Sequence, residues 1–112
     1  MAITFYMLLK DSEDITKLKS EEDAVHFDEE VYDFLCRNNP IRLGEITLPL
    51  LGLDPYGGEE IFYTEEIKEF IKICEILKNE YAEVEVHNFS NQLIQLCTRA
   101  LASKRNIATL GD

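Results

Sequence analysis

The chain has 112 residues, 46% of them hydrophobic, and its 22 acidic residues outnumber the 11 basic ones to give a formal net charge of -11. This charge disfavours contact with nucleic acid or anionic lipid and favours a basic protein as a partner. The length predicts one domain over residues 1–112, the periodic apolar residues argue against disorder, and no apolar run approaches the roughly 20 residues of a membrane span.

The chain opens with the alternation of a strand. Ile3, Phe5 and Met7 share one side, and the residues between them are also largely apolar. This pattern predicts a strand that is buried on both faces. Ser12 is then placed to cap a short helix that runs to Leu18.

Most of the negative charge lies in an acidic block between residues 11 and 33, where ten acids and two lysines leave a local charge of -8. Within it, Asp28 is placed to cap a helix that ends before Asn38, with Phe27 packing onto Tyr32. Glu29 and Glu30 then fall in the first turn of this helix, where the helix dipole favours negative charge. Helix electrostatics therefore accounts for part of the block.

The middle of the chain lacks a clear helical pattern. Residues 46–53 are apolar and are predicted to be extended, with Pro49 confining them to an edge strand or a buried loop. Residues 54–58 form a predicted turn with Tyr56 at its tip. An exposed tyrosine among charged residues is a frequent binding anchor, and a tyrosine folded back onto the core is the equally acceptable alternative.

The clearest predicted element is a helix over residues 65–81, capped by Thr64. Its apolar stripe consists of Ile67, Phe70, Ile71, Cys74, Leu77 and Tyr81. Residues 83–87 then suggest a short strand or a helical continuation, Ser90 is placed to open a last helix, and residues 107–110 suggest a closing strand. The order predicts a small, helix-rich α+β domain with three to four helices on a short mixed sheet.

No pattern in the chain indicates catalysis. His26 has acids on both sides, but a lone histidine in a polar turn is more often simply solvated. Cys36, Cys74 and Cys97 form no CxxC motif and are predicted to be reduced core thiols, as in a cytosolic protein. The acids at 21–23 and 28 lack the glycine-containing loop of a calcium site, so they predict a solvated face. We therefore expect no enzyme activity, no cofactor and no metal.

Three stretches resemble the YfbM-like family of small bacterial proteins: ITFYMLLKDSEDITKL, YGGEEIFYTEEIKEFIKICEIL and LIQLCTRALASKRNIATLG. The resemblance implies an α+β fold and no settled function. In overall character the chain also resembles the immunity proteins of bacterial toxin systems. Those proteins are small, cytosolic and acidic, and they neutralise a toxin, often a basic nuclease, by covering its active site or substrate groove.

We therefore predict a cytoplasmic immunity-type protein that binds a basic toxin of the nuclease type and acts as a monomer or weak homodimer. Its predicted partner-binding residues are Glu21, Glu22, Asp23, Asp28, Glu29, Glu30, Asp33, Tyr56, Glu59 and Glu60. The alternatives are a small enzyme or ligand-binding domain with a pocket near Tyr56 and His26, and a structural subunit of an acidic complex.

Overall fold

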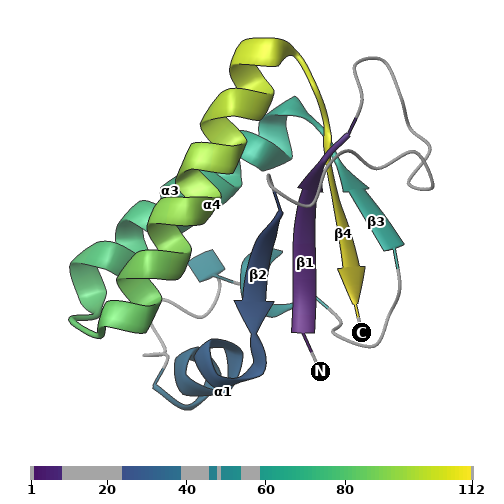
Figure 1. Ribbon diagram of the computed structural model, residues 1–112. Helices are drawn as coiled ribbons and strands as arrows, with labels where there is room; N and C mark the ends of the chain where they lie inside the picture. The colour runs from purple at the N-terminus through teal and green to yellow at the C-terminus, as the bar shows by residue number, and fades with distance from the viewer. Residues whose placement is uncertain (1, 9–23, 39–45, 48, 54–58, 112) are drawn as a thin grey trace.

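The computed structural model describes residues 2–8, 24–38, 46–47, 49–53 and 59–111. Its elements follow the order β1 (Ala2–Met7), β2 (Val25–Asp28), α1 (Glu29–Arg37), β3 (Glu59–Phe62), α3 (Thr64–Glu80), α4 (Val84–Ser103) and β4 (Ile107–Gly111). Residues 46–47 and 49–51 are also helical. The helix-rich α+β class predicted from the sequence is confirmed (Figure 1).

The four strands form one sheet in the order β2-β1-β4-β3. Every neighbouring pair is antiparallel, so the mixed sheet predicted from the sequence is wrong. The predicted closing strand exists as β4, and it lies inside the sheet rather than at its edge. In this order β2 and β3 are the two outer strands.

Helices α3 and α4 run side by side across one face of the sheet, and α1 lies at the end of β2 (Figure 1). Alternation along β1 points Phe5 at these helices, where its ring lies 5.8 Å from that of Phe70 and 6.4 Å from that of Phe89. Ile3 and Met7 share that face of β1 and are buried with it. The core therefore lies between the sheet and the helix pair.

Helix α3 confirms the strongest sequence prediction. Ile67, Phe70, Cys74 and Leu77 are at most 1% exposed, as their spacing along one helical face requires. The helix begins one residue earlier than predicted, because the cap is Tyr63, whose backbone N–H donates to Glu66 Oε1 at 3.2 Å.

Helix α4 corrects the prediction of a short strand over residues 83–87. One helix runs from Val84 to Ser103, and the helical alternative is the correct one. Val86, Phe89 and Leu93 are buried at a spacing of three to four residues, which places them on one helical face against the core. Ser90, predicted to open the last helix, instead lies buried within it.

The prediction of an extended segment over residues 46–53 is also wrong. Its described residues are mainly helical, and Thr47, Leu50 and Leu53 are buried at intervals of three. Pro49 is compatible with this because proline is tolerated in the first turn of a helix.

Strands β2 and β3 were not predicted. Residues 25–28 alternate between buried and exposed, so His26 lies on a strand and not in a polar turn. The predicted short helix over residues 12–18 and the predicted turn over residues 54–58 lie outside the described residues.

Candidate functional site

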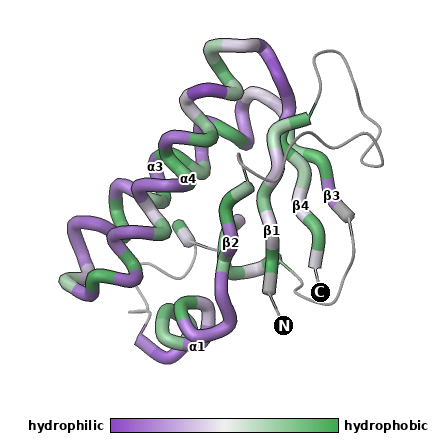
Figure 2. Tube along the Cα trace, viewed as in Figure 1, coloured by the Kyte–Doolittle hydropathy of each residue, from purple (hydrophilic) through white to green (hydrophobic). Residues whose placement is uncertain are grey.

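The predicted binding residues that the structure describes lie in two separate places. Asp28, Glu29 and Glu30 are exposed where β2 leads into α1, and Asp33 is half-buried on α1. This hydrophilic junction is visible in Figure 2. Glu60 is exposed on β3, and Glu59 belongs to the same strand. The other predicted binding residues, Glu21, Glu22, Asp23 and Tyr56, lie outside the described residues.

The sheet order separates the described acids into two groups. Asp28 ends β2 and Glu60 lies on β3, and these are the two outer strands of the sheet. The acids of residues 28–33 and those of residues 59–60 therefore do not form one continuous surface. Each group instead lies beside a hollow of its own.

Two adjoining hollows lie between α1 and the start of α4. The first has a volume of about 190 Å³ and is lined by Glu30, Val31, Phe34, Glu83, Glu85 and Val86. The second, of about 200 Å³, shares three of these residues and adds His26, Asp28, Asn88, Phe89 and Gln92. We call the two together the acidic groove. Its carboxylates belong to Asp28, Glu30, Glu83 and Glu85, of which the last two were not predicted as binding residues.

Aromatic packing fixes the walls of the acidic groove. The ring of Phe27, at the end of β2, stacks on that of Phe89 in α4 with centroids 4.4 Å apart and an interplanar angle of 14°. Phe27 also packs edge-on against Tyr32 of α1 at 5.5 Å, as predicted from the sequence. One buried ring thus ties β2, α1 and α4 together below the carboxylates.

The carboxylates of the acidic groove are not neutralised within the described part of the chain. No lysine or arginine there forms an ion pair with Asp28, Glu30, Glu83 or Glu85. The floor between them is apolar, formed by Val31, Phe34 and Val86. Val84, in the first turn of α4, leaves 66% of its surface exposed. An apolar floor with an acidic rim is suited to a basic and partly apolar partner.

His26, the candidate for an enzymatic role, is exposed on β2, and its Nδ1 lies 3.2 Å from Thr4 Oγ1. It lines the acidic groove beside Asp28. No serine or cysteine lines the groove with it among the described residues. The described hydrogen-bond partner of its ring is the Thr4 hydroxyl on the neighbouring strand β1.

The cysteines divide into two kinds. Cys74 and Cys97 are buried, which confirms the prediction of core thiols, whereas Cys36 is exposed on α1 and contradicts it. Burial raises the pKa of Cys97 to about 12, and burial together with the neighbouring Cys97 raises the pKa of Cys74 still further. A buried thiol with a raised pKa is a poor nucleophile, so these two residues serve packing.

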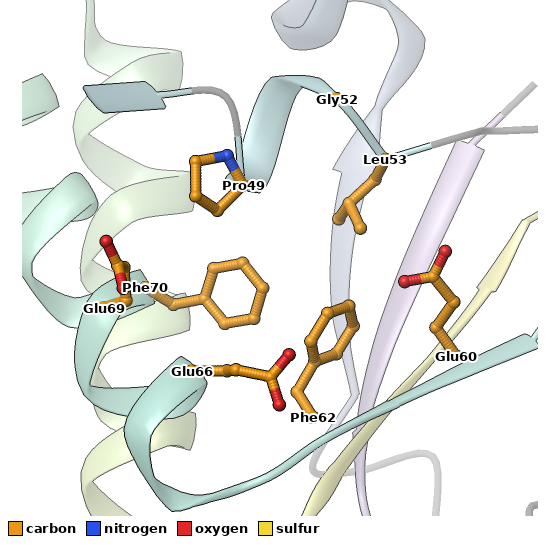
Figure 3. Close-up of a pocket in the computed structure, with 8 residues that line it drawn as sticks. All are labelled: Pro49, Gly52, Leu53, Glu60, Phe62, Glu66, Glu69 and Phe70. Atoms are coloured by element: carbon orange, nitrogen blue, oxygen red, sulfur yellow. The ribbon is translucent and has the colours of Figure 1, made fainter. Parts of the chain in front are cut away.

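A separate hollow, which we call the edge pocket, lies where β3 meets α3 (Figure 3). It has a volume of about 520 Å³ and is lined by Pro49, Gly52, Leu53, Glu60, Phe62, Glu66, Glu69 and Phe70. The rings of Phe62 and Phe70 lie 5.0 Å apart at 78° in its floor. Glu66 and Glu69 were not predicted as binding residues from the sequence.

A comparison with family models, curated proteins and solved structures finds no match. The resemblance to YfbM-like proteins therefore stays a prediction. Within the described ranges, no helix combines the length and apolar character needed to cross a membrane.

Proposed function

We propose that this chain is an immunity-type protein that binds and neutralises a basic protein toxin of the nuclease type. The observation that carries the proposal is the acidic groove. Its four carboxylates come from two segments about 55 residues apart in the sequence, and they converge on an apolar floor without cationic partners in the described part of the chain.

The helix dipoles favour each of the four carboxylates at its own helix start, but they do not require the two helix starts to meet at one groove. Asp28 and Glu30 lie at the start of α1, and Glu83 and Glu85 lie at the start of α4, where the positive ends of the helix dipoles favour acids. Bringing both helix starts to one hollow adds like-charge repulsion. A partner that supplies cations to the groove relieves this repulsion.

In the proposed mechanism the acidic groove occupies the surface of the toxin that would otherwise bind nucleic acid. A nuclease holds phosphates with lysine and arginine, and the carboxylates of the groove offer those side chains an alternative anionic partner. The charge of the whole chain speeds encounter, so that association approaches about 10⁸ M⁻¹s⁻¹ at low salt. Val84 and the apolar floor are then buried at the centre of the contact, where apolar burial contributes most to affinity. Inhibition of this kind takes place in the cytoplasm of the cell that makes the protein.

The first partner to test is a basic protein encoded beside the gene for this chain. We expect co-production of the chain to protect cells from that protein and a purified complex to form. Neutralising Glu30, Glu83 and Glu85 as glutamines should weaken the complex at least about tenfold, because charge-assisted contacts are lost.

The matched control neutralises Glu65, Glu75 and Glu80, which are exposed acids of α3 outside both hollows. It changes the net charge by the same amount and should retain protection and most of the affinity. Equal weakening by both variants would show that only net charge matters, and it would remove the groove from the proposal.

A further inference from the structure

The edge pocket combines an aromatic floor with an acidic rim. Phe62 and Phe70 are 7% and 1% exposed, so both rings of the floor are packed into the core. Figure 3 shows these rings between Pro49 and Leu53 on one side and the carboxylate of Glu66 on the other, with Glu60 and Glu69 flanking them. The volume of about 520 Å³ lies within the range of roughly 300–1,000 Å³ that is usual for ligand pockets.

The rim concentrates the negative charge of three carboxylates, of which Glu66 also accepts the capping hydrogen bond from the Tyr63 N–H. Glu66 and Glu69 are three residues apart on α3, so they are neighbours on one helical face and repel each other. Glu60 joins them from β3 across the pocket. In the described part of the chain, none of the three forms an ion pair with lysine or arginine.

These two properties select one class of ligand. A guanidinium or ammonium group satisfies the carboxylates and interacts favourably with aromatic rings. An apolar stem behind the charge covers Phe62, Phe70 and Leu53. A bare cation leaves this floor exposed, and an anion is repelled by the rim. A neutral apolar group removes water from the carboxylates without replacing its hydrogen bonds.

We propose that the edge pocket binds a cationic group on an apolar stem, namely an arginine side chain of the protein partner. This inference rests on the proposed function, since it assigns a second anchor to the same basic partner. Arginine fits better than lysine because its planar guanidinium bonds carboxylates in pairs and also stacks on aromatic rings.

The acidic groove and the edge pocket lie near each other in the fold. The Tyr32 hydroxyl of α1 donates a hydrogen bond to the Leu51 carbonyl oxygen at 3.1 Å. Helix α1 lines the acidic groove, and Leu51 is adjacent to Gly52, which lines the edge pocket. The sheet between the two outer strands spans only about 14 Å, at the usual strand spacing of about 4.8 Å. The distance between the two sites is therefore smaller than the width of a single protein domain.

The test uses small probes and the intact chain. Butylguanidinium is titrated while backbone amide signals are followed by NMR, beside guanidinium, which lacks the stem, and pentanamide, which lacks the charge. We expect saturable shifts at Phe62, Glu66 and Glu69 with butylguanidinium, and apparent affinities about tenfold or more lower for the other two probes. Glu66→Gln with Glu69→Gln should weaken butylguanidinium binding by about tenfold, whereas Glu65→Gln with Glu75→Gln should leave it unchanged.

The substituted residues are exposed on α3, and Glu66→Gln keeps a side-chain oxygen that can accept the capping hydrogen bond from the Tyr63 N–H, so the fold should be retained, and thermal unfolding checks this. Equal responses to the three probes, or shifts that ignore Glu66→Gln with Glu69→Gln, would overturn the edge-pocket proposal. That result leaves the acidic groove untouched, because the probes need no protein partner. Undiminished partner binding by the groove variant, combined with saturable butylguanidinium binding, would instead overturn the groove proposal and leave the edge pocket in place.

Discussion

At the scale of single residues, each acid of the acidic groove has a local role as well as the proposed one. Asp28 and Glu30 stabilise the start of α1, and Glu83 and Glu85 stabilise the start of α4. Neutralising one of them should therefore cost the fold only a few tenths of a kcal/mol. A larger effect on binding than on stability is the expected signature of a binding residue in this groove.

The cysteines give a prediction at the same scale. A thiol reagent applied to the native protein near pH 8 should label Cys36 quickly and the other two only after unfolding. Burial raises the pKa of Cys97 to about 12 and that of Cys74 further, so both remain protonated and covered at this pH. Mass spectrometry of labelled peptides measures this. Rapid native labelling of Cys97 would contradict the packing described for α4.

At the scale of elements, α3 is the main support of the core. It packs against α4 and, through Phe70, against Phe5 of β1 and Phe62 of β3. Phe70→Ala should lower the free energy of unfolding by about 3–5 kcal/mol, because it removes buried aromatic surface and leaves a cavity. Chemical denaturation measures the loss.

Glu69→Gln is the control for this substitution, since Glu69 is exposed on the neighbouring position of the same helix. It should change stability by no more than about 0.5 kcal/mol. If Phe70→Ala left stability unchanged while abolishing partner binding, α3 would be an interface helix and the core assignment would be wrong.

Elements with one dominant apolar period were predictable from the sequence, and those with competing signals were not. β1 and α3 each follow a single period over their whole length, and both are confirmed. In residues 46–53, Pro49 favoured an extended interpretation, although the buried residues recur every three positions. Around Val84 and Val86 the strict alternation with acids imitated a strand.

The same ambiguity concealed half of the acidic groove. Asp28, Glu29 and Glu30 were predicted as binding residues because they belong to the acidic block, whose charge is visible in one stretch of sequence. Glu83 and Glu85 join them only through the packing of Phe27 on Phe89, a contact between residues 62 positions apart in the sequence. Contacts of this range carry no local signal.

At the scale of the whole molecule, the sheet order decides how charge is distributed. Because β1 and β4 occupy the centre of the sheet, β2 and β3 are its outer strands, and the acids on β2 and β3 lie at opposite edges. Acids from separate parts of the described chain thus line two sites, the acidic groove and the edge pocket, and the hydrogen bond from Tyr32 to the Leu51 carbonyl oxygen links the segments beside them. This arrangement suits a partner that is larger than either hollow.

The most direct test of the proposed function is the salt dependence of the association rate with the basic partner. Stopped-flow measurements between low salt and 0.5 M should show a steep fall in rate for the natural chain, because salt screens long-range attraction. The Glu30, Glu83 and Glu85 variant should associate more slowly at low salt with a much shallower slope, whereas the Glu65, Glu75 and Glu80 control should keep most of the slope. An unchanged slope in the groove variant would contradict the assignment of the acidic groove as the binding surface.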